Sequence, residues 1–90
     1  RCDLYFMSAQ AVDVDCASDT VMELVEMKRT MLASSEKTIL LADSSRFKAR
    51  ALYRIAALDQ INAIITDEGL SGDIRTTIRA HGLELSCVKV

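Results

Sequence analysis

The chain has little of what would divide it into separate units. It contains no proline and only three glycines among its 90 residues, and no stretch is rich in glycine, serine or proline. The composition therefore excludes a flexible linker of the usual kind. Ninety residues suffice for one small domain that buries roughly two thirds of its unfolded surface. We expect residues 1–90 to form a single domain.

Cysteine and histidine are also scarce. The three cysteines, Cys2, Cys16 and Cys87, lie far apart and form no C-x-x-C pair. This spacing favours neither a zinc site nor a disulfide framework, and it is typical of reduced cysteines in a cytoplasmic protein. His81 is the only histidine. Without a second histidine or a nearby serine or cysteine constellation, it is expected to be structural, and no metal or cofactor is predicted.

Two further absences concern partners. No apolar run approaches the ~20 residues of a membrane span, and no signal-peptide pattern opens the chain. The net charge of -2 lacks the basic surplus that usually accompanies duplex binding. We therefore predict a cytoplasmic location, no membrane partner, and contact with DNA only through another domain.

Strand-like and helix-like patterns alternate along the chain. Leu4 to Met7 is apolar, and the polar, acidic stretch 8–19 after it is expected to be a loop. Further strands are predicted at 38–42, 61–66 and 83–87, an extended piece at 52–56, a single helical turn at 58–60, and helices at 21–34 and about 70–82. This alternation predicts an α/β fold, Rossmann-like, with a largely parallel sheet and flanking helices.

The first predicted helix carries a lysine in its apolar face. Thr20 and Glu23 have capping-box spacing at its start. Lys28 falls in the middle of a stripe that we expect to pack on the sheet, formed by Val21, Leu24, Val25, Met31 and Leu32. It must either extend to solvent or meet a partner, and near a crevice its ammonium could hold a phosphate or carboxylate. At 100° per residue, Glu26 lies about 160° from Lys28 around the helix axis, and we expect it to face solvent.

The predicted strand 38–42 runs into a polar turn. Residues 39–42 are continuously apolar, as expected for a parallel strand covered on both faces. In open α/β sheets ligands collect at the carboxyl ends of such strands, where Ser44, Ser45 and Arg46 would be presented. Arg46 can bind a phosphate through two parallel hydrogen bonds. Phe47, the next residue, could cover one face of a bound ligand.

Three segments together carry a family resemblance. The stretch ADSSRFKARALYRIAALDQINAIITD, with the upstream DLYFMSAQAVDVD and VEMKRTML, resembles the C-terminal sensor domain of the DeoR/GlpR family of bacterial sugar-operon repressors. The match spans nearly the whole chain. That domain resembles ribose-5-phosphate isomerase A, whose fold binds phosphorylated sugars. The resemblance implies a homo-oligomeric sensor whose winged helix-turn-helix domain is absent from these residues, which would be the C-terminal half of a larger sensor domain.

The resemblance also bears on individual residues. In the family, the strand end and the turn usually have the sequence A-D-x-S-K-F-G, so Arg46 stands where the family has a lysine. An arginine reaches farther than a lysine and carries a planar guanidinium group. Asp13 aligns with the family's G-I-D segment, but the glycines of that loop are missing here, so the backbone cannot approach a ligand as closely. The sensor domains and the isomerase have an E-x-K pattern at the matching place, and this supports Glu26 and Lys28 as ligand-binding residues.

Three functions remain open. The preferred hypothesis is a non-enzymatic sensor of a phosphorylated sugar, with these candidate ligand-binding residues: Arg46, Lys28, Ser44, Ser45, Asp13, Glu26 and Phe47. An isomerase-like enzyme would need a carboxylate base, Asp13 or Glu26, with Lys28 as the electrophile. A purely structural oligomerisation module would pair through an unpaired strand edge.

Overall fold

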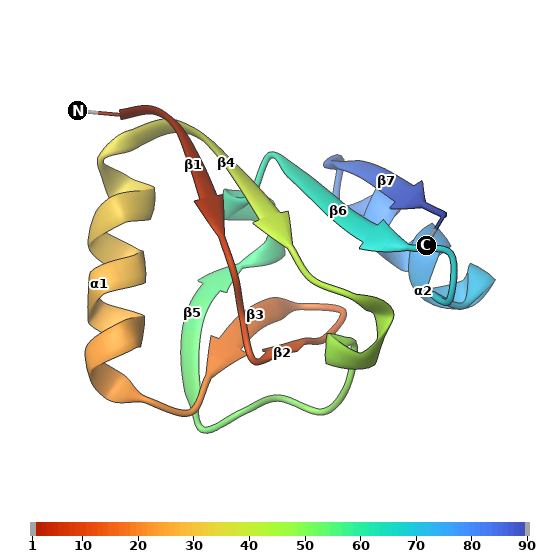
Figure 1. Ribbon diagram of the computed structural model, residues 1–90, viewed down its shortest axis with the longest axis horizontal. Coiled ribbons are helices and arrows are strands. Elements are labelled where there is room, and N and C mark those ends of the chain that lie inside the picture. Colours follow the sequence, from red (N-terminus) through yellow and green to blue (C-terminus); the bar gives the residue numbers. More distant parts are fainter. Residues whose placement is uncertain (1, 90) are drawn as a thin grey trace.

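The computed structural model describes the backbone of residues 2–89 and the side chains of residues 3–89. Figure 1 shows α1 beside β1 and β4 at one end of the molecule, and β7 with α2 at the other. The four strands of the larger sheet are all parallel and are ordered β1-β4-β6-β7. The elements are β1 (Cys2–Met7), α1 (Met22–Ala33), β4 (Ser35–Leu41), β6 (Ala63–Asp67), α2 (Gly72–Ala80) and β7 (Glu84–Val88). The predicted α/β class with a largely parallel sheet is confirmed.

A second, antiparallel sheet was not predicted. It consists of β2 (Ala11–Val12), β3 (Cys16–Asp19) and β5 (Tyr53–Ala57), in that order. The expected loop at 8–19 is therefore wrong, because most of it forms a hairpin. Its strands are short and built largely from small residues that are buried, so they lack the alternation of apolar and polar residues that marks a half-exposed strand. The extended piece and the single turn expected at 52–60 are confirmed by β5 and a 3₁₀ turn at Leu58–Gln60.

Helix α1 buries only part of the predicted stripe. Val25 and Lys28 are buried and Leu32 packs partly against the core, at spacings of three and four residues. Val21 and Leu24, expected on the packed face, are largely exposed. The capping box is also wrong, since the residue that caps α1 is Val21 and no side chain bonds to the first turn. The helix is therefore held by its packed face rather than by its cap.

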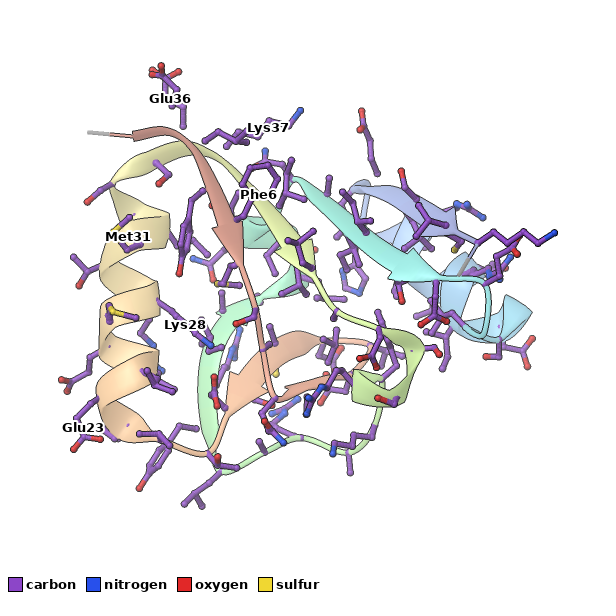
Figure 2. All side chains as sticks on the ribbon, in the orientation of Figure 1. Phe6, Glu23, Lys28, Met31, Glu36 and Lys37 are labelled. Atoms are coloured by element: carbon purple, nitrogen blue, oxygen red, sulfur yellow. The ribbon has the colours of Figure 1, made fainter. Side chains whose placement is uncertain are left out.

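One face of the parallel sheet is covered and the other is open. Met7, Leu40 and Ile64 share the covered face and join one core with residues of α1, α2 and the small sheet. On the opposite face, Phe6 is 54% exposed and Leu41 43% exposed. Figure 2 shows Phe6 on β1, with no helix in front of it. The expectation that residues 39–42 are covered on both faces is therefore wrong for the part of the chain that the structure describes.

The end of α2 is tied to two distant segments by His81. The helix stops where Gly82 takes a positive φ of 88°, the left-handed conformation that ends many helices. The two ring nitrogens of His81 lie 2.7 Å from Asp59 Oδ1 and 2.6 Å from the carbonyl oxygen of Val14. Both partners can only accept, so the protonated ring donates to both. The hydrogen bond to Asp59, followed by that to Val14, raises the pKa of His81 above its ordinary value.

Cys16 and Cys87 are free thiols. Neither helix described among residues 2–89 has the length and apolarity needed to cross a membrane.

Replacing Leu40 should show how strongly the covered face holds the fold. Leu40 is 0% exposed, whereas Leu52 is 75% exposed. We expect Leu40→Ala to lower the free energy of unfolding by about 2–5 kcal/mol, because it removes buried methyl groups and leaves a cavity. The same change at Leu52 should alter it by no more than about 0.5 kcal/mol. Urea unfolding of both variants measures the difference, and equal effects would contradict the assigned core.

His81 should make stability depend on pH. Because its folded pKa lies above the unfolded value of about 6.5, its contribution is complete below about pH 6.5 and is lost as pH rises through the folded pKa. We expect His81→Gln to lack this loss. NMR titration of the only imidazole, with urea unfolding between about pH 5 and 9, measures both quantities. An imidazole that titrates at or below its ordinary pKa would exclude the double hydrogen bond.

Candidate functional site

A polar cleft of about 370 Å³ opens at the carboxyl ends of β1 and β4. This is the edge of a parallel sheet at which ligands usually bind. Four segments that are distant in sequence meet there: the residues after β1, the last residue of β3, the middle of α1, and the turn after β4. The lining residues are Ser8, Ala9, Gln10, Asp19, Leu24, Lys28, Leu41, Ala42, Asp43 and Arg46.

Lys28 meets a partner inside the protein instead of extending to solvent. Its Nζ donates to Asp19 Oδ2 at 2.6 Å and to the carbonyl oxygen of Ser8 at 2.8 Å. The Lys28 and Asp19 side chains are only 9% and 7% exposed. Figure 2 shows Lys28 reaching from α1 toward the strands, whereas Glu23 on the same helix points away. The ion pair therefore joins α1 to β3 and to the end of β1.

Asp19 was not among the residues singled out from the sequence. A lysine in an apolar face signals an acidic partner, but three aspartates, Asp13, Asp15 and Asp19, lie in the segment before the helix. The choice among them depends on β3, the strand that was not predicted. Asp19 is its last residue, and its Oδ1 also accepts the amide hydrogen of Thr20 at 2.9 Å.

Arg46 supplies the second cation of the cleft. It ends the 3₁₀ turn Ser44–Arg46, which Asp43 caps by accepting the amide hydrogen of Ser45 at 2.9 Å. The Arg46 side chain is half-buried and makes no hydrogen bond or ion pair with any other residue between 2 and 89. Its guanidinium therefore keeps all of its donors for an external anion.

Asp67, at the end of β6, fixes the position of this turn. Its Oδ2 accepts the amide hydrogen of Ser44 at 2.9 Å, and its Oδ1 accepts that of Gly69 at 2.8 Å. The hydrogen bonds from Ser44, and then that from Gly69, lower the pKa of Asp67. The approach is close, because a Cβ atom at Gly69 would lie 2.7 Å from Ser44 Oγ. The turn that carries Arg46 is thus anchored to the neighbouring strand.

Two of the candidate residues support the turn without lining the cleft. The Ser44 amide is bonded to Asp67, and both the amide and the hydroxyl of Ser45 donate to Asp43 Oδ1. Phe47 packs against the core and lines a separate, mainly apolar pocket of about 220 Å³ next to Val12. The structure therefore keeps Lys28 and Arg46 together but places Phe47 elsewhere.

The two predicted carboxylates also lie outside the cleft. Glu26 is on the exposed side of α1, as the helical geometry predicted. Asp13 is in the β2–β3 turn, where its carboxylate accepts the amide hydrogens of Asp15 and Cys16 and pairs with Arg50 at 3.0 Å. Partial burial raises the pKa of Asp13, but these hydrogen bonds outweigh it, so that the pKa is lowered. Asp13 is thus bound to its own hairpin.

The family of DeoR C terminal sensor domains matches residues 1–68. The chain belongs to this family. It is 34% identical over 82 residues to the HTH-type transcriptional regulator GlpR of Haloferax volcanii, covering 90% of this chain and 32% of that protein. It is 31% identical over 87 residues to the putative aga operon transcriptional repressor of Escherichia coli O157:H7, covering 96% and 32%.

A further relative is named for a phosphorylated compound. The chain is 30% identical over 69 residues to the glycerol-3-phosphate regulon repressor of Haemophilus influenzae, covering 76% of this chain and 27% of that protein. The chain thus spans about a third of the length of the curated relatives that it matches. These relatives are named as transcriptional regulators or repressors.

Breaking the Lys28–Asp19 pair should be costly. Lys28→Met leaves a nearly buried carboxylate without its cation, and we expect it to lower the free energy of unfolding by about 3–5 kcal/mol. Arg50→Met is the matched control, because Arg50 pairs with Asp13 while 47% exposed, and it should cost no more than about 1 kcal/mol. The double variant Lys28→Met/Asp19→Asn should recover part of the loss. Equal urea midpoints for the two single variants would show that the pair does not hold the fold.

Proposed function

We propose that this chain is the effector-sensing part of a DeoR-type transcriptional repressor. It binds a phosphorylated sugar in the cleft at the ends of β1 and β4, and it thereby modulates DNA binding by a separate winged helix-turn-helix domain. The observation that carries the proposal is the Arg46 guanidinium, which lines the cleft and has no partner among the described residues. The regulatory relatives, one of them named for glycerol 3-phosphate, support the same reading.

The cleft has the groups that such a ligand needs. The phosphate binds Arg46 through parallel hydrogen bonds, which are strong because both partners are charged. Sugar hydroxyls need acceptors as well as donors, and Gln10, Asp19 and Asp43 offer both kinds of group around the same cleft. Ser44, Ser45 and Asp67 hold Arg46 in place through the turn and do not contact the ligand themselves.

Binding acts on regulation through the segments that meet at the cleft. A ligand changes an equilibrium only if it binds one conformation better than another. A phosphosugar that bridges Arg46 and the Lys28–Asp19 pair would favour the arrangement in which the turn after β4, α1 and β3 lie close together. We propose that this arrangement is transmitted to the DNA-binding domain in a cytoplasmic homo-oligomer.

The isomerase alternative finds less support. It requires a carboxylate base beside the substrate, and Asp13 and Glu26 both lie outside the cleft. Its electrophile, Lys28, is already paired with Asp19. We therefore propose a binding role without catalysis.

The open face of the parallel sheet supports the proposal that this chain is the C-terminal part of a larger sensor domain. Leu4, Phe6 and Leu41 are each more than 40% exposed and lie on the same face of adjacent strands. Apolar surface of this kind normally packs against further protein. The relatives are about three times as long as the chain, and we propose that another part of the same domain covers this face.

The full-length protein should be stabilised by a phosphorylated sugar through Arg46. In a thermal-shift titration against phosphorylated and unphosphorylated sugars, a ligand at about 100 times its Kd should add about 2.7 kcal/mol. Arg46→Ala should weaken its binding by at least about tenfold. Arg54→Ala, an exposed arginine outside the cleft, should leave the binding unchanged. Operator affinity should change with the same sugar. No shift with any phosphosugar, or an equal shift in Arg46→Ala, would rule out the proposed site.

A further inference from the structure

We propose that Asp19 determines which phosphorylated sugars the cleft accepts. By neutralising Lys28, it reserves that part of the cleft for uncharged hydroxyl groups, so that the ligand carries one phosphate and no second anionic group. This inference rests on the proposed function, because it concerns the selectivity of the same cleft.

The two cations of the cleft are in different electrostatic states. Lys28 lies 2.6 Å from Asp19, and both side chains are almost fully buried, so the pair has no net charge. Arg46 lines the same cleft and has no ionic partner among residues 2–89. A ligand anion is therefore attracted to Arg46, whose guanidinium is unpaired, although the carboxylate of Asp43, which accepts hydrogen bonds from Ser45, also lines the cleft. An anion brought to Lys28 instead approaches the carboxylate of Asp19, which lies only 2.6 Å from the ammonium. Juxtaposed like charges in a partly buried site suppress the wrong partner.

The hydrogen-bonding capacity of the pair fits a hydroxyl group. An ammonium has three donors, and Lys28 uses two of them on Asp19 and on the carbonyl oxygen of Ser8. Each oxygen of Asp19 accepts one hydrogen bond, from Lys28 or from the amide of Thr20, and can accept another. The pair thus offers one donor beside free acceptor positions. A sugar hydroxyl can use both, whereas a carboxylate or phosphate could use only the donor.

Matched pairs of ligands test this selectivity in the full-length protein. Isothermal titration at constant ionic strength compares glucose 6-phosphate with 6-phosphogluconate, and ribose 5-phosphate with 5-phosphoribonate. Within each pair C1 is oxidised from the aldehyde level to a carboxylate, which also keeps the acid in an open chain, so the change in the ratio between wild-type protein and Asp19→Asn isolates the effect of charge. The comparison uses whichever of the two pairs binds more tightly. Wild-type protein should bind the aldose phosphate of that pair at least about tenfold more tightly than the corresponding phosphorylated acid. Asp19→Asn should shift this ratio by at least about tenfold toward the acid.

Two controls separate this effect from a general change in the protein. Asp73→Asn makes the same chemical change at an exposed position of α2, away from the cleft, and should leave the affinity ratio unchanged. Asp19→Asn/Lys28→Met removes the cation as well, and it should lose the gained affinity for the acid. If Asp19→Asn does not fold, Asp19→Ser replaces it, and the wild-type ratio remains a test that needs no variant.

The outcomes distinguish this inference from the function on which it rests. A wild-type protein that prefers the phosphorylated acid, or an unchanged ratio in folded Asp19→Asn, would overturn the role of Asp19 while leaving the phosphosugar sensor intact. Failure of every phosphosugar to bind the wild-type protein would overturn both. A wild-type preference for the aldose phosphate that disappears in Asp19→Asn, but not in Asp73→Asn, supports the proposal.

Discussion

The ion pair between Lys28 and Asp19 is the constraint on which the rest of the structure depends. It places two charges in a nearly dry position, where either one alone would be strongly unfavourable. Because Lys28 also bonds the backbone of Ser8, the pair fixes three segments at once: the end of β1, the end of β3 and the middle of α1. The cleft exists because these segments are held together beside the turn after β4.

The opposite side of the cleft depends on hydrogen bonds to a carboxylate at a strand end. Asp67 accepts amide hydrogens from Ser44 and Gly69, so the turn that carries Arg46 is set by β6 as well as by β4. The two sides are built differently. On one side a buried charge is satisfied internally, and on the other a charge is held in position but left for a ligand. Under the function proposed above, this asymmetry would let one cleft recognise an anionic group and neutral groups together.

The parts of the fold that were predictable follow from strong local patterns. The strands predicted at 38–42 and 61–66 from their apolar runs are confirmed by β4 and β6. The β2–β3 hairpin was missed because small buried residues show no alternation. In the site, a strand end pointed to Arg46, and an interrupted apolar stripe pointed to Lys28. Asp19 could not be chosen, since its pairing depends on a strand that only the tertiary structure reveals.

The open face of the parallel sheet bears on how this family can diversify. Phe6 and Leu41 project from the face opposite the core, whereas Lys28 and Asp19 belong to segments packed on the covered face. Because side chains alternate between the faces of a strand, a substitution that refits the open face to a new neighbour leaves the residues of the ion pair in place. The neighbour that packs on the open face and the charges of the ion pair can therefore change independently, and Leu41, which lies on the open face and also lines the cleft, is where the two surfaces meet.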